Sequence, residues 1–94
     1  MKIFSFFTQE LAVDLGTANT LIMQNDEIVI DEPSIVAINR TTNEVLAVGY
    51  KAMQMHEKTH ENIKTIRPLK DGVIADFQAA ESLIEGLINT IKSR

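Results

Sequence analysis

The sequence predicts an α/β fold in which strands are followed by a helix, a short strand and a last helix, and three observations carry this prediction. Short apolar runs separated by Gly and Asn turns fill the first half of the chain, as expected for strands. After Tyr50 the apolar residues recur every three or four positions, which is the period of a helix. The helical period returns after Asp76 and continues almost to the last residue.

The composition indicates one small folded domain and excludes several classes of protein. The chain has 94 residues, of which 45% are hydrophobic, and it has no cysteine for a disulfide or a thiolate metal site. Its net charge of −4 is spread along the chain, so no nucleic-acid partner is expected. No apolar run approaches the roughly 20 residues of a membrane-spanning helix. The first apolar run is also shorter than the about 7–15 residues of a secretory signal, so a cytoplasmic protein is expected.

The first half of the chain is expected to form a series of antiparallel strands. Five strands are predicted, at residues 11–15, 20–23, 28–30, 34–38 and 45–48. A turn containing Gly16 and Asn19 joins the first two strands, which therefore form a hairpin. Pro33 interrupts the series and favours an edge strand or a bend, because proline cannot donate to a sheet.

The next segment is predicted to be a helix from Tyr50 to about Glu61, followed by an extended stretch over 62–68. Pro68 ends any helix before it, because the residue preceding a proline avoids the helical conformation. A turn at 71–72 and a short strand at 73–75 complete this part. His56 and His60 are four residues apart on the predicted helix, the spacing of two metal ligands, but no acidic third ligand is fixed nearby. Both histidines are interpreted as solvent-facing.

The last element is predicted to be an amphipathic helix with Asp76 as its N-cap. Its apolar stripe consists of Phe77, Ala80, Leu83, Ile84, Leu87, Ile88 and Ile91. Gly86 costs a helix about 1 kcal/mol relative to alanine, so close packing is expected there. The preceding strands offer too little surface to cover the whole stripe, and part of it is expected to stay exposed.

The turn of the first hairpin has the residue types of a phosphate-binding loop. Gly16 has no Cβ and lets the backbone approach a phosphate closely. Thr17, Asn19 and Thr20 add hydroxyl and amide groups within reach of the same oxygens. Asp14 precedes the turn and could hold Mg²⁺, directly or through water, between its carboxylate and the phosphates. The Asp-Leu-Gly-Thr sequence alone is also common in ordinary hairpin turns that bind no ligand.

Three longer blocks resemble the MreB family of bacterial actin-like, rod-shape-determining proteins. The sequence DLGTANT at 14–20 is similar to the first phosphate motif of the actin, heat-shock chaperone and sugar-kinase superfamily, and its Ala-Asn-Thr ending is typical of MreB. Residues 32–38 resemble the family's EPSVVAI segment, and residues 66–77 resemble its IRPLKDGVIADF segment. At 59–63 the chain departs from the family's Thr-Pro-Gly-Asn-Ile turn.

The resemblance implies an actin-like ATPase fold of the ribonuclease H-like kind, of which this chain would hold the N-terminal part. Residues 10–94 would belong to the first lobe, and about 32–70 to its small outer subdomain. The implied cofactors are ATP and Mg²⁺, with Asp14 as the metal residue and a nucleotide-binding set of Gly16, Thr17, Ala18, Asn19 and Thr20. No catalytic residue is expected, because the second phosphate loop and the catalytic acid belong to later parts of the family sequence. The family hydrolyses ATP, whereas this chain alone is not expected to.

Residues 1–9 are expected to form an amphipathic tail that binds a membrane surface. The tail contains three of the four phenylalanines in the chain. Wound as a helix, it would place its apolar residues on one side and its basic and polar residues opposite, which suits shallow insertion. The apolar side would consist of Ile3, Phe4, Phe6 and Phe7. Composition alone equally favours a terminal strand or a patch packed on the protein's own core. The resemblance favours the membrane, because several family members carry such a tail.

The function implied by the resemblance is cytoskeletal. The chain would be a fragment of a protein that forms ATP-dependent filaments at the inner face of the cell membrane and organises cell-wall synthesis. Its partners would be other filament subunits, the inner membrane surface and the cell-wall elongation machinery. The alternatives are a sugar or acetate kinase, a heat-shock chaperone relative and a short paralogue that regulates filaments. Whether the reading frame continues past Arg94 would separate the fragment from the short paralogue.

Overall fold

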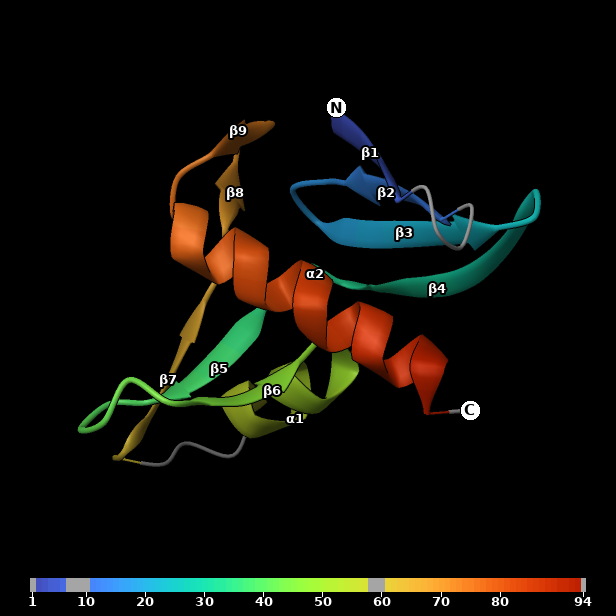
Figure 1. Cartoon of the computed structure of the whole chain (residues 1–94). Coiled ribbons are helices and arrows are strands. Elements are labelled where there is room, and N and C mark those ends of the chain that lie inside the picture. Colours follow the sequence, from blue (N-terminus) through green and yellow to red (C-terminus); the bar gives the residue numbers. More distant parts are fainter. Residues whose placement is uncertain (1, 7–10, 58–60, 94) are drawn as a thin grey trace.

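The computed structural model describes residues 2–6, 11–57 and 61–93, which form three small sheets and two helices (Figure 1). The strands are β1 (Lys2–Phe6), β2 (Leu11–Leu15), β3 (Asn19–Gln24), β4 (Glu27–Pro33), β5 (Val36–Asn39), β6 (Val45–Val48), β7 (Ile63–Ile66), β8 (Leu69–Lys70) and β9 (Val73–Ile74). The helices are α1 (Tyr50–Glu57) and α2 (Phe77–Lys92).

The largest sheet has four antiparallel strands in the order β1-β2-β3-β4. The predicted hairpin is confirmed as β2 and β3, with Val13 opposite Ile22. Alternate residues of β2 are buried, which places one face of the sheet against the core. Asn25 and Asp26 both have positive φ angles and turn β3 tightly into β4. β4 is an edge strand that ends at Pro33, as proline at that position predicted.

The N-terminal segment is a strand here, not the helix that its spacing suggested. β1 pairs with β2 in antiparallel register, with Phe4 opposite Val13. Without β1, β2 would present a row of unpaired N–H and C=O groups at the sheet edge, and phenylalanine and isoleucine favour such pairing. Phe7 lies outside the described residues. The assignment of Ile3, Phe4, Phe6 and Phe7 to a membrane surface stays a prediction.

The second sheet has the order β6-β5-β7 and carries α1 on one face. Ile35, Ala37 and Ala52 form its small buried cluster. α1 ends at Glu57, and Glu61 lies in a turn, so the predicted end of this helix near Glu61 is wrong. The His56 Nδ1 atom lies 2.6 Å from Thr65 Oγ1 on β7, while His60 is outside the described residues.

The third sheet is a two-stranded hairpin of β8 and β9, of which only the second strand was predicted. Asp71 and Gly72 both have positive φ angles, and they form the tight turn expected at these positions. The carbonyl of Pro68 accepts hydrogen bonds from the N–H groups of Ala75 and Asp76, at 2.7 and 3.1 Å. These bonds close the hairpin directly onto the start of α2.

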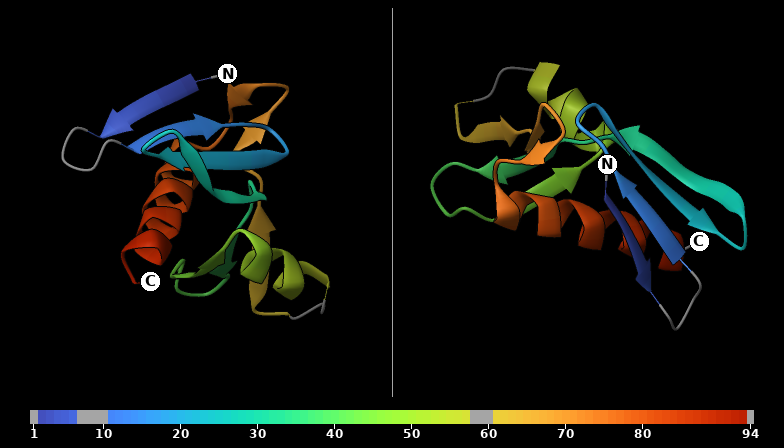
Figure 2. Two further views of the ribbon diagram at one scale, coloured as in Figure 1. Left: turned by 90° about the vertical axis from the view of Figure 1, so that its right-hand side faces the viewer. Right: turned by 90° about the horizontal axis from the view of Figure 1, so that it is seen from above.

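α2 lies between the two larger sheets and joins them through one hydrophobic core (Figures 1 and 2). Its N-cap is confirmed, since Asp76 Oδ1 accepts from the Ala79 N–H at 3.0 Å. Its buried residues are Ala79, Ala80, Leu83 and Leu87. The close packing predicted at Gly86 is also present, because a Cβ there would lie 2.7 Å from Val48 Cγ2 of β6. Within the described part of the chain, neither helix is long and apolar enough to cross a membrane.

Candidate functional site

The candidate site is the turn between β2 and β3, which requires a glycine at its first position. A Cβ on Gly16 would lie 2.5 Å from the carbonyl oxygen of Asn19. Real side chains do not tolerate so short a distance to a backbone oxygen, so the turn as built is open only to glycine. This glycine is the residue that the phosphate-loop prediction places at the turn, and the approach of a ligand to its backbone stays a prediction.

Ser34, which follows β4, holds this turn from below through three hydrogen bonds. Its Oγ donates to the Gly16 carbonyl at 2.7 Å, and its N–H donates to the Ala18 carbonyl at 2.8 Å. The Thr20 and Ser34 hydroxyl oxygens are 2.7 Å apart. A serine hydroxyl has a single proton, which here goes to Gly16, so Thr20 must be the donor to Ser34. Thr20 and Ser34 are both completely buried.

The outer side of the turn consists of the exposed residues Thr17, Ala18 and Asn19. Asn19 Nδ2 donates to Asp31 Oδ1 on β4 at 2.9 Å. Thr17 Oγ1 accepts from the Gly72 N–H at 2.7 Å, so the β8–β9 turn lies against the loop. Because Thr17 accepts in this bond, its own hydroxyl proton remains available to an acceptor such as a phosphate oxygen.

Asp14 has a carboxylate that fits a role in metal binding. Its Oδ1 is buried and has no hydrogen-bond partner among the residues that the structure describes. A buried carboxylate oxygen without a partner is unfavourable, and a hard cation would satisfy it. Within the described ranges no cluster of three or more His, Cys, Asp or Glu side chains surrounds it. Asp14 would therefore supply one protein ligand group, which matches Mg²⁺ bound mainly by phosphate and water.

The predicted nucleotide set is thus brought together, with one difference in how its members are presented. Thr17, Ala18 and Asn19 are accessible, and Gly16 lies half-buried beside them. The hydroxyl of Thr20 lies beneath the turn, and its proton is directed to Ser34. Nucleotide binding by this segment stays a prediction, and the burial of Thr20 favours support of the loop over direct contact with a ligand.

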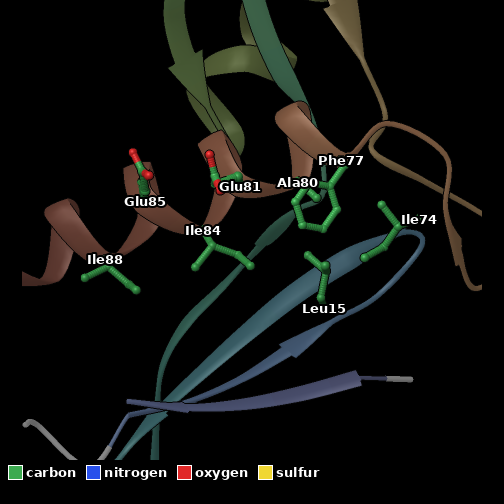
Figure 3. A pocket seen from close by; sticks show the side chains of 8 residues that line it. All are labelled: Leu15, Ile74, Phe77, Ala80, Glu81, Ile84, Glu85 and Ile88. Atoms are coloured by element: carbon green, nitrogen blue, oxygen red, sulfur yellow. The ribbon is translucent and has the colours of Figure 1, made fainter. Parts of the chain in front are cut away.

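A separate apolar groove runs along α2 (Figure 3). Phe77, Ile74 and Leu15 point toward one another there, and Phe77 is 72% exposed. The predicted partial exposure of the helix stripe is confirmed by this residue. Glu81 and Glu85 are the charged residues of the groove and have the wrong sign for phosphate, so the groove is no part of the candidate site.

Two residues of the second sequence block are important in the structure and had no role assigned from the sequence. Ser34 holds the turn, as described above. Glu32 Oε1 accepts from the Tyr50 N–H at 3.0 Å, which caps the start of α1. Gly49 precedes that helix with a positive φ angle, and a Cβ there would overlap the Glu32 carboxylate. A serine or glutamate beside Pro33 carries no local signal for such contacts, since the partners are distant in sequence.

The comparisons with known proteins agree with this architecture. The family model described as MreB/Mbl protein matches residues 8–94. The cell shape-determining protein Mbl of Bacillus cereus is 51% identical over 86 residues, which cover 90% of this chain and 26% of that protein. The cell shape-determining protein MreB of Escherichia coli is 45% identical over 97 residues, which cover 98% of this chain and 28% of that protein. The chain therefore spans about a quarter of the length of these relatives.

Two crystal structures of MreB5 of Spiroplasma citri are similar to the fold. The ADP-bound structure matches with a TM-score of 0.74 and 43% sequence identity. The matched region covers 86% of this chain and 25% of the MreB5 chain. The AMPPNP-bound structure matches with a TM-score of 0.76 and 43% sequence identity, over 85% of this chain and 24% of the MreB5 chain. These similarities confirm the predicted partial actin-like fold. Together with the family match, they favour the MreB interpretation over the kinase and chaperone alternatives.

Proposed function

This chain belongs to the MreB/Mbl family, and from that premise we propose that it forms the first part of a cell-shape-determining, actin-like protein whose β2–β3 loop binds the phosphates of Mg-ATP. The observation that carries the proposal is the shape of the β2–β3 loop, which requires glycine at position 16 and exposes residues 17–19. The two similar MreB5 structures are bound to ADP and AMPPNP, which supports a nucleotide as the ligand.

The loop residues divide the work of binding. Gly16, Thr17, Ala18 and Asn19 would meet the phosphate oxygens through backbone N–H groups and the Thr17 hydroxyl. Thr20 would support the loop from below through its bond to Ser34. Asp14 would hold Mg²⁺, which neutralises part of the phosphate charge when bound. Its buried Oδ1 supports this role, because the atom lacks a hydrogen-bond partner among the described residues.

The 94 residues alone are proposed to bind nucleotide weakly and not to hydrolyse it. One loop can surround one side of a polyphosphate, and oxygens on the other side would remain in water. The binding free energy is what remains of the interaction free energy after the cost of association is subtracted. A loop that contacts one side of the polyphosphate therefore leaves little net affinity. Assembly into filaments, attachment to the inner face of the cell membrane from the cytoplasm and contact with cell-wall synthesis are proposals of the same kind. They are supported by the name cell shape-determining protein that the Mbl and MreB relatives carry.

The proposal is tested by titrating the chain with Mg-ADP and Mg-ATP while the backbone amide signals are followed by NMR. The amides of 16–19 should shift, with an affinity weaker than about 1 μM, which corresponds to about −8 kcal/mol. Asp14→Ala should remove the dependence on Mg²⁺, while Glu44→Ala, which removes an exposed carboxylate from the turn between β5 and β6, should not. The absence of chemical-shift changes in the loop amides with both nucleotides at millimolar concentration would refute the proposed function.

A further inference from the structure

We propose that Ser34 is a positioning residue of the phosphate loop, which turns two loop carbonyls inward and thereby directs the N–H groups of Thr17 and Asn19 outward. This inference rests on the proposed phosphate-binding role of the loop. It assigns to Ser34, a buried residue outside the motif, the orientation of the donors that a phosphate would meet.

The orientation follows from the planarity of the peptide group. In a trans peptide the C=O and the following N–H point in opposite directions. The Gly16 carbonyl points to Ser34 Oγ at 2.7 Å, so the Thr17 N–H of the same peptide points away from Ser34. The Ala18 carbonyl points to the Ser34 N–H at 2.8 Å, so the Asn19 N–H also points away. One residue thus fixes two alternate peptide planes of the loop.

The Ser34 hydroxyl has a single arrangement that satisfies its neighbours. It donates to Gly16 and accepts from Thr20, so reversing it would leave the Gly16 carbonyl without this donor. Ser34 and Thr20 are completely buried, and water cannot easily replace either bond. The Gly16–Thr17 peptide therefore depends on the Ser34 side chain, whereas the Ala18–Asn19 peptide depends on its backbone.

The residues on either side of Ser34 are bonded to the second sheet and its helix. Two residues earlier, Glu32 Oε1 accepts from the Tyr50 N–H at the start of α1. One residue later, the Ile35 carbonyl accepts from the Gly49 N–H at 3.0 Å. These bonds tie the segment that contains Ser34 to the start of α1 and restrict its movement with the loop. A fixed support of this kind is what a positioning residue needs.

The test exploits the difference between the two peptides. Ser34→Ala deletes the bond to Gly16 and keeps the backbone bond to Ala18. In the ligand-free chain the Thr17 amide signal should therefore shift clearly, while the Asn19 amide changes less. In a Mg-ADP titration, the initial slope of the loop amide shifts should fall about tenfold, a change of about 1.4 kcal/mol.

Two further variants separate positioning from folding. Thr65→Val deletes a hydroxyl that bonds His56 at 2.6 Å in the second sheet, and it should leave both the Thr17 amide and the titration slope unchanged. Ser34→Cys fills a similar volume with a much weaker donor, and it should repeat the effects of Ser34→Ala even if the alanine variant does not fold.

The possible outcomes are distinct. An unmoved Thr17 amide in Ser34→Ala and Ser34→Cys would overturn the inference about Ser34. Equal changes at Thr17 and Asn19, or an equal loss of slope in Thr65→Val, would also overturn it, since either result indicates general destabilisation. If Mg-ADP causes no shift of the loop amides in the wild-type chain, only the proposed function is overturned. The amide shifts of the ligand-free variants still decide the role of Ser34.

Discussion

Gly86 offers the sharpest test of how α2 packs against the second sheet. Replacing glycine by alanine inside a helix ordinarily stabilises the protein, because glycine loses more backbone entropy on folding. At this position the new Cβ would lie 2.7 Å from Val48 Cγ2 and 3.0 Å from Val48 Cγ1. We therefore expect Gly86→Ala to lower the free energy of unfolding, against the general rule for helices.

The magnitude follows from two opposing effects. Helix propensity favours alanine by about 1 kcal/mol. Forcing an extra methyl group into a packed contact costs roughly 1–3 kcal/mol. The difference is a net loss of roughly 0–2 kcal/mol, and a loss of about 1 kcal/mol lowers the melting temperature of a chain of this size by about 4–8 °C.

The assay is thermal and urea unfolding followed by circular dichroism, in a double-mutant cycle with Val48→Ala. In the Val48→Ala background the obstacle is gone, so Gly86→Ala should stabilise by about 1 kcal/mol. The coupling energy between the two sites should be roughly 1–3 kcal/mol. Asn89→Ala, on the exposed side of the same helix, is the control and should stay within about 0.5 kcal/mol. A Gly86→Ala chain that melts higher than wild type, or a coupling energy near zero, would refute the packing argument.

Two further predictions concern the helix cap and the N-terminal tail. Asp76→Ala should lose about 1 kcal/mol of stability in the same unfolding assay because it removes the N-cap, whereas Asp76→Asn should retain most of it; equal losses in both would contradict the cap. Residues 1–9 fused to a soluble reporter should bind anionic vesicles weakly, and two tandem copies should bind far better in a flotation assay. Phe4→Asp should abolish this binding and Ser5→Asp should weaken it less; equal losses would contradict an amphipathic helix at the membrane, and no binding by the tandem would contradict the anchor itself.

The elements that the sequence predicted well are those set by local rules. The β2–β3 hairpin follows from two apolar runs around a Gly/Asn turn, and α2 follows from a capped 3.6-residue period. The elements that it left open or missed depend on pairing with a neighbouring strand. β1 is a strand because β2 offers an open edge, and β8 exists because a turn folds β9 back onto it. A two-residue strand such as β8 has no periodicity to read.

The candidate site shows the same division. Gly16 and Asp14 were identified because their residue types and positions in the motif carry the chemistry of phosphate and metal binding. Ser34 was missed because its hydrogen bond to the Gly16 carbonyl spans 18 residues of sequence, and the residues next to Ser34 give no local signal for this bond. Thr20 was placed among the ligand contacts because a threonine hydroxyl has the right chemistry. Only the fold reveals that this hydroxyl is buried and already bonded.

The three sequence blocks that resemble the MreB family meet in space at the loop. The turn of the first block is bonded by Ser34 of the second block and, through Thr17, by Gly72 of the third block, 55 residues away. A hydrogen bond of this kind contributes about 0.5–1.5 kcal/mol net, so the Ser34 bonds that orient the two peptides act together with the Gly72 bond in holding the loop as a whole. The loop therefore owes its shape to the folded arrangement of all three sheets. It follows that the motif in an isolated hairpin would contain the same residues without the fixed peptide planes on which the proposed phosphate site depends.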